Sequence, residues 1–306
     1  MIEYSPNRDW WKDLGHLGTS WTLQRIVRAV MAVGIYSAAL SFVILRLDLE
    51  GHRSISGTFS LLGVILSIVL VFRTNSAYDR WWEGRKLWGA LVNHSRNLAI
   101  GLDALIPVDD GDSRDAFARL IRDFALALSG HLRGKVDPSI KLESGRDAQE
   151  EHAPGHVPSF LSRAILLRIY GLRRDGVIDG LDVLALKPHT QALLDVAGAC
   201  ERIRKTPIPF SYSAFIKLFV VLYAAILPVG LVPEYGYLAV PLVMLVVFAL
   251  LGLELMAEEI EDPFGLDCND LATGSIARMI GCDVAELLGT ACPIRDQPAA
   301  PYSKVF

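Results

Sequence analysis

The sequence predicts an all-α membrane protein with four transmembrane helices and a cytosolic helical body. Of its 306 residues, 52% are hydrophobic and the mean hydropathy is +0.34, yet 21% are charged. Several apolar runs approach or reach the roughly 20 residues that a helix needs to cross a bilayer. A long polar stretch between them spaces its apolar residues at three and four, as amphipathic helices do. A lipid-embedded part and a water-facing part therefore share the chain.

The first two predicted spans differ in length. Residues 26–45 are long enough to cross alone. The polar residues before them lack the apolar core of a secretory signal, so we expect span one to be retained, preceded by an N-terminal amphipathic segment. The second apolar run, residues 58–72, is short at roughly 15 residues. No glycine or proline interrupts residues 73–83. We therefore expect this span to continue as a polar helix.

Residues 214–232 and 237–256 form the other two predicted spans, a hairpin with a link free of lysine and arginine. Basic residues follow span two and precede span three, so the positive-inside rule places both termini in the cytoplasm and the protein in the cytoplasmic membrane. The predicted regions are residues 1–72, with spans one and two; 73–213, the cytosolic helical region; 214–256, with spans three and four; and 257–306, the cytosolic C-terminal segment.

The cytosolic region is expected to be largely helical. Residues 87–105, 115–132 and 160–170 have helical apolar spacing, whereas residues 135–159 are rich in Gly, Pro and charged residues and predict an exposed loop. His152 and His156 fall in that loop with Pro and Gly between them, which does not favour a metal site.

Composition and motifs exclude several functions. A net charge of −4 and a pI near 6.0 argue against nucleic acid as a partner. No phosphate-binding glycine loop, nucleophile elbow or HExxH helix is present, so the chain is not expected to be an enzyme. The four cysteines lack CxxC spacing and are expected to be reduced: Cys200, Cys268, Cys282 and Cys292.

Span two carries an apolar stripe. Val64, Ile68 and Phe72 fall at i, i+4 and i+8, on one helix face. Such a stripe usually reflects packing against lipid or protein. The functional alternative is a hydrophobic constriction, which forms when several copies of the helix surround an axis.

Three polar segments flank the spans. Residues 78–85 mix four charges with three aromatic side chains and predict either an interfacial belt or a packed joint with the cytosolic body. Pro207 and Pro209 predict a corner before span three. Residues 257–270 hold six carboxylates, which suit either Ca²⁺ or a metal-free cap, and Glu254 in span four is expected to face protein or water.

At these same residues the chain resembles the bestrophin family of pentameric ion channels, in its bacterial branch. The resemblance covers residues 21–288 and rests on residues 72–88, on Cys200-Glu-Arg-Ile with residues 206–210, and on Asp262-Pro-Phe-Gly followed by Asn269-Asp. It implies a homopentamer around one axial pore, in which the second helix of each subunit lines a narrow neck.

Site residues follow from the resemblance. The neck residues of the family fall on Val64, Ile68 and Phe72. A cytosolic constriction, ahead of the helix that ends in Cys200-Glu-Arg-Ile, falls on Leu181 and Leu184. The calcium ligands of animal members fall on Glu259, Asp262, Asp267 and Asp270. Because residues 266–270 replace a run of consecutive acids, we expect no cofactor, with calcium as the alternative.

The resulting hypothesis is a passive ion channel for monovalent ions, gated by a hydrophobic neck and surrounded by membrane lipids. The resemblance implies chloride or other anions if the chain behaves as the animal members do. It implies monovalent cations such as sodium if the chain behaves as the bacterial members do. Apolar rings do not choose a sign, but Arg73 would favour anions and Glu254 cations if either faced the pathway. The alternatives are a secondary transporter, which predicts inverted repeats, and a membrane-tethered scaffold, which predicts no pore.

Overall fold

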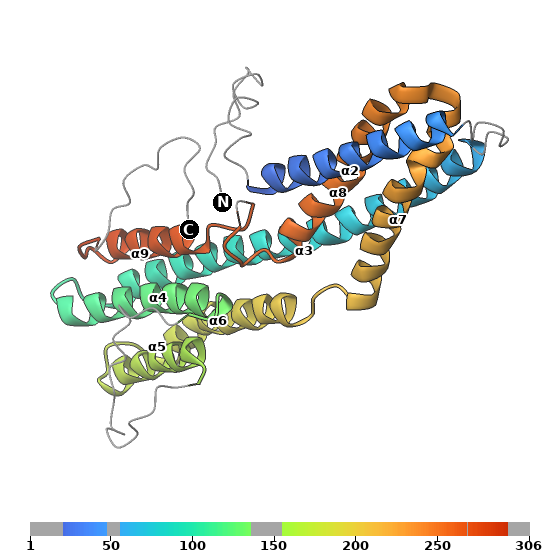
Figure 1. The fold of residues 1–306 in the computed structure, drawn as a ribbon. Helices are drawn as coiled ribbons and strands as arrows, with labels where there is room; N and C mark the ends of the chain where they lie inside the picture. Colours follow the sequence, from blue (N-terminus) through green and yellow to red (C-terminus); the bar gives the residue numbers. More distant parts are fainter. Residues whose placement is uncertain (1–20, 48–55, 136–154, 268, 293–306) are drawn as a thin grey trace. The chain divides into compact units, whose positions relative to one another are not determined.

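The computed structural model describes residues 21–47, 56–135, 155–267 and 269–292, and this part of the chain is helical without a strand (Figure 1). The chain divides into two compact units. Of the described residues, the apolar unit comprises 21–47, 56–81 and 207–262, and the polar unit comprises 82–135, 155–206, 263–267 and 269–292. Helix α3, Ser56–Leu105, begins in the apolar unit and ends in the polar unit. The predicted continuation of span two as a polar helix is therefore confirmed.

The apolar unit contains α2 (Trp21–Arg46), the first part of α3, α7 (Phe210–Tyr235) and α8 (Ala239–Glu261). Helix α2 packs against α7 and α8. Their shared core gathers apolar side chains from all four helices, among them Ile26, Leu66, Leu70, Val220 and Val247. The burial of Leu66 and Leu70 fixes which face of α3 turns inward.

Within the described part of the chain, three helical stretches are long and apolar enough to cross a membrane: Thr22–Arg46, Gly57–Leu105 and Phe210–Glu261. The third contains α7 and α8, which correspond to the third and fourth predicted spans. The predicted link of residues 233–236 is misplaced, because α7 extends to Tyr235 and a single turn of 3₁₀ helix, η3 (Gly236–Leu238), leads into α8. Gly236 adopts φ 54°, a conformation that glycine takes at low cost.

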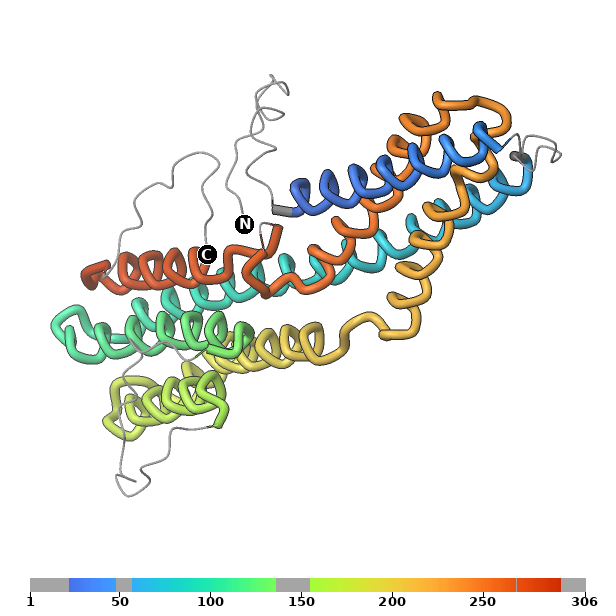
Figure 2. The backbone as a smooth tube through the Cα atoms, viewed as in Figure 1, coloured from blue at the N-terminus to red at the C-terminus, as the bar shows by residue number. Residues whose placement is uncertain are grey.

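The polar unit contains the rest of α3, α4 (Gly111–Leu132), α5 (Val157–Arg174), α6 (Gly180–Lys205) and α9 (Thr273–Leu287). Helix α4 lies against both α5 and α9, although α9 is far along the chain, as the backbone trace in Figure 2 shows. Side-chain caps begin three of these helices: Asp110 at α4, His156 at α5, and Asp179 in a capping box at α6. Helix α6 ends at Lys205 and α7 begins at Phe210, so the predicted break in the helix at Pro207 and Pro209 is confirmed.

Candidate functional site

The stripe on α3 lies on an exposed face of the apolar unit. In the single chain Val64 is 54% exposed, Ile68 53% and Phe72 62%, whereas Leu66 and Leu70 are fully buried. The helix thus anchors one side in the core and leaves an apolar ridge on the other. The structure confirms the alignment of the stripe, while its role as a neck stays a prediction.

The residue after Phe72 turns the opposite way. Arg73 is fully buried, and its Nη2 donates to Glu261 Oε2 at 2.6 Å, while its Nε lies 3.7 Å from Glu254 Oε2. Glu261 also accepts from the Ile208 N–H at 3.0 Å, and its carbonyl accepts from Arg80 Nε at 3.0 Å. These residues, which we call the Arg73 cluster, join α3, α8 and the segment just before α7 beside the apolar ridge.

Burial of this cluster answers one question that the sequence left open. Glu254 is only 2% exposed in the single chain, and Arg73 is not exposed at all. Association with further subunits can only reduce exposure. Neither side chain therefore presents its charge to a passing ion, and the two cannot select the sign of the ion by direct contact.

The segment at residues 78–85 contains both exposed and packed positions, and its two predicted roles stay predictions. Tyr78 and Trp82 are about half exposed, as an interfacial belt requires. Gly84, in contrast, is buried: a Cβ at this position would lie 3.2 Å from the ring of Phe264 and 3.3 Å from Leu271. Gly84 therefore permits close packing between α3 and the Pro263–Leu271 turn, within the polar unit.

The proposed cytosolic constriction lies in the first two turns of α6, not ahead of the helix that contains Cys200. Leu181 is 75% exposed and Leu184 62%, whereas Leu186 is buried. The helix begins before these two leucines, because Pro188 lies inside α6 rather than at its start, while their role in a constriction stays a prediction. The two exposed leucines remain candidates for contact with a pathway.

The four calcium-ligand equivalents divide between the two units. Glu259 is buried in the apolar unit and accepts from Thr22 Oγ1 at 2.8 Å, and Asp262 ends α8 with an exposed side chain. In the polar unit, Asp267 is exposed, while the carboxylate of Asp270 is buried and accepts from the Asp267 N–H. Two of the four carboxylates thus already have structural partners.

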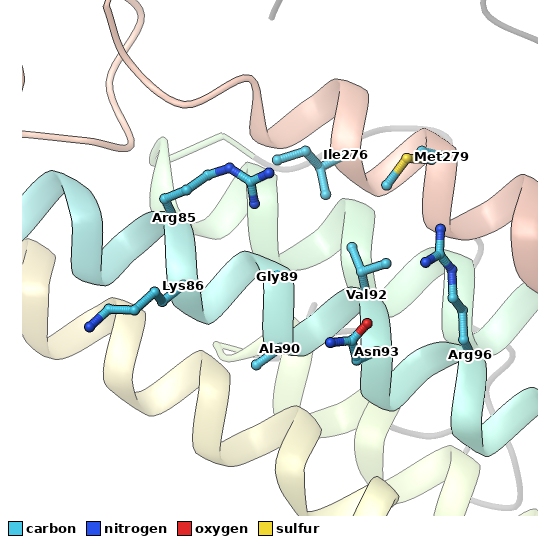
Figure 3. A pocket seen from close by; sticks show the side chains of 9 residues that line it. All are labelled: Arg85, Lys86, Gly89, Ala90, Val92, Asn93, Arg96, Ile276 and Met279. Atoms are coloured by element: carbon cyan, nitrogen blue, oxygen red, sulfur yellow. The ribbon is translucent and has the colours of Figure 1, made fainter.

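The polar unit also holds a basic pocket of about 530 Å³ between α3 and α9 (Figure 3). Arg85, Lys86 and Arg96 supply its cationic side chains, and Ile276 and Met279 form part of its apolar wall. Asp283 accepts two hydrogen bonds from Arg96, at 2.5 and 2.9 Å. That carboxylate partly offsets the positive charge of the pocket.

Two features of the polar unit were not expected from the sequence. Cys282 forms a disulfide with Cys292, so the prediction of reduced thiols is wrong for this pair. Cys200 is a buried free thiol whose pKa is raised to about 12 by burial and by the nearby carboxylates of Glu83 and Glu201. Cys268 lies outside the described residues.

The second feature is a cluster of His131, His156 and Glu201. His156 was set aside because His152, its supposed partner in the sequence, shares no helix face with it; His152 itself lies outside the described residues. Burial opposes ionisation of Glu201, but hydrogen bonds from His156 and Lys205 lower its pKa to about 2. Partial burial and the neighbouring His156 lower the pKa of His131. No sequence signal joins these residues, because long stretches of chain separate them.

Comparison with known proteins gives a consistent result. Residues 2–286 match the family described as bacterial/fungal bestrophin protein. A voltage-dependent anion channel-forming protein of Mesorhizobium japonicum is 35% identical over 275 residues, 88% of this chain and 87% of that protein. The protein of the same description from Escherichia coli is 31% identical over 273 residues, 87% of each. A crystal structure of a variant bestrophin homologue from Klebsiella pneumoniae superposes with a TM-score of 0.78 at 25% identity, covering 86% of this chain and 99% of that one.

Proposed function

The chain belongs to the bacterial and fungal bestrophin family and is therefore an ion channel, not an enzyme, and we propose that the exposed ridge of α3 lines its conduction pathway. One observation carries this proposal: Val64, Ile68 and Phe72 are aligned and exposed while the opposite face of the same helix is buried. An apolar ring of this kind excludes hydrated ions until the pore widens.

A ring requires several subunits. We propose a homopentamer, since the resemblance to bestrophins implies five subunits. We place it in the cytoplasmic membrane with both termini in the cytoplasm, since basic segments follow span two and precede span three. The three long apolar stretches support the membrane location. A scaffold would be a monomer or dimer without a pore, so native mass spectrometry of the purified protein separates it from a pentameric channel.

The ions are monovalent in this proposal, and their sign must come from groups other than Arg73 and Glu254, which are buried. Relatives are described as anion channel-forming, whereas the resemblance to bacterial bestrophins implies cations. Reversal potentials in asymmetric KCl and then NaCl assign the sign. A secondary transporter would instead give no single-channel current.

The neck is tested by widening it. Replacing Ile68 and Phe72 together by alanine removes two apolar rings, so we expect a higher open probability or conductance in planar bilayers. Leu218→Ala on α7 is the matched control, because Leu218 is 57% exposed and apolar but lies on another helix. Unchanged currents in the double variant, with the wild type conducting, would contradict the neck assignment.

We also propose that conduction needs no calcium. The partners of Glu259 and Asp270 described above support this, since a hard cation would require six to eight oxygen ligands free to converge. Chelation of calcium with EGTA is expected to leave the current unchanged. A current that disappears on chelation and returns with calcium would contradict this proposal.

A further inference from the structure

Three potential metal ligands meet in the polar unit. His131 lies near the end of α4, His156 caps the start of α5, and Glu201 lies near the end of α6. One ligand atom from each lies within 4.8 Å of the others. His131 Nε2 is 3.3 Å from Glu201 Oε1, His156 Nε2 contacts the same oxygen, and the two imidazole rings pack edge to face with centroids 4.7 Å apart.

We propose that His131, His156 and Glu201 form a binding site for Zn²⁺. Two imidazole nitrogens and one carboxylate oxygen are a common zinc ligand set, with water in the fourth position. Zinc bonds of about 2.0–2.2 Å in a tetrahedron place neighbouring ligand atoms roughly 3.3 Å apart. The separation of His131 Nε2 and Glu201 Oε1 already has this value. His156 must withdraw from Glu201 to admit the ion.

The ligand types select the metal. Calcium and magnesium require more oxygen ligands than this cluster offers, whereas imidazole favours zinc and neighbouring transition metals. Lys205 contacts the other carboxylate oxygen, Glu201 Oε2, at 2.9 Å, so Oε1 remains on the side of the histidines. Lys205 is 71% exposed and can move into water when a cation binds. The inference does not depend on the channel pathway.

Zinc binding has an identifiable cost at His156. Its Nδ1 accepts the Ser159 N–H at 3.1 Å, so in the metal-free state the proton of a neutral ring is on Nε2. When Nε2 binds the metal, the ring proton moves through solvent to Nδ1, and the Ser159 N–H donates to water instead. That hydrogen bond is exposed. Its loss therefore costs little compared with the metal–ligand bonds that form.

Zinc titration of the purified, EDTA-stripped full chain in competition with a chromophoric chelator tests the site. The wild type is expected to bind one Zn²⁺ per chain, and His131→Gln or Glu201→Gln to weaken binding by at least about tenfold. His156→Asn is the sharpest variant, because asparagine keeps a helix N-cap while removing the imidazole ligand. His189→Gln is the control: His189 pairs with His94, with Nδ1 atoms 3.2 Å apart, in the same unit.

A measurement on the wild type alone guards against misfolded variants. Zinc is expected to protect His131 and His156, but not His94, from modification by diethyl pyrocarbonate, as mapped by mass spectrometry. The inference is overturned if the wild type binds less than one equivalent, if all variants bind zinc as the wild type does, or if zinc fails to protect these two histidines.

Discussion

Each unit buries an arginine, and the two are satisfied in different ways. In the polar unit, Arg114 is 7% exposed and its guanidinium donates to the side chain and carbonyl of Asp103 and to the carbonyls of Ile106, Pro107 and Leu288. All three nitrogens are therefore used. Arg114 fixes one arrangement of the loop after α3 and of the end of α9.

In the apolar unit, Arg73 makes one short ion pair with Glu261, and its Nε and Nη1 have no hydrogen-bond partner among the described residues. Its nearest other partner is Glu254, at ion-pair distance only. Buried polar groups without partners are costly and often mark places where a structure rearranges. The comparison indicates that Arg114 holds a single fixed arrangement, whereas Arg73 lies where α3 and α8 meet, beside the apolar ridge.

The largest expected effect is that of Arg73→Ala. Its removal leaves the buried carboxylate of Glu254 and the partly buried carboxylate of Glu261 without this cation, and loss of a buried partner typically costs about 3–5 kcal/mol. Thermal unfolding of the detergent-solubilised protein should show a clearly lower midpoint. Arg28→Ala is the control, because the Arg28 side chain is exposed and, among the described residues, donates a hydrogen bond to the Gln24 carbonyl. Equal midpoints for the two variants would contradict the structural role of Arg73.

Lysine substitutions sharpen the comparison. Arg73→Lys keeps a single charged hydrogen bond, so we expect it to recover most of the stability lost in Arg73→Ala. Arg114→Lys cannot reproduce the planar guanidinium fork that reaches several carbonyls, and we expect it to recover little of the loss in Arg114→Ala. The same unfolding assay decides this, and equal recovery at both positions would show that the two arginines are bound alike.

Two glycines of α3 offer a smaller contrast within the polar unit. Gly84→Ala should cost about 1–2 kcal/mol, because the new methyl group would press on Phe264 and Leu271. At Gly89 the nearest atom to a new Cβ is Arg85 Nη1 at 3.7 Å, so Gly89→Ala should stabilise the helix by about 0.5–1 kcal/mol. Matched unfolding midpoints measure the difference, and effects of the same sign would refute the packing at Gly84.

The smallest expected effect concerns pH. Partial burial and the neighbouring His94 lower the pKa of His189 below its usual value of 6.5. The unfolded chain then binds more protons than the folded one as the pH falls through 6.5, so stability should decrease in that range. Unfolding midpoints measured between pH 8 and pH 5 should fall less in His189→Gln than in the wild type. An equal fall would place the titrating group elsewhere.

Part of the site could be predicted because it lies within one helix. The spacing of Val64, Ile68 and Phe72 is a property of local sequence, and the uninterrupted run into residues 73–83 predicted that α3 continues. The start of α6 was harder. The capping box at Asp179 begins the helix ahead of Leu181, and Pro188 is accommodated inside it.

The sequence by itself determined the helical class, the apolar spans, the aligned apolar stripe of α3 and the family, because all of these depend on periodicity or on contiguous motifs. Only the tertiary structure decided that Arg73 turns inward to Glu261, that Cys282 pairs with Cys292, and that His131, His156 and Glu201 meet. The physical reason is the separation along the chain over which each signal acts. Periodicity acts over a few residues, whereas most of these contacts join residues far apart in the chain, whose approach is fixed by the packing of whole helices.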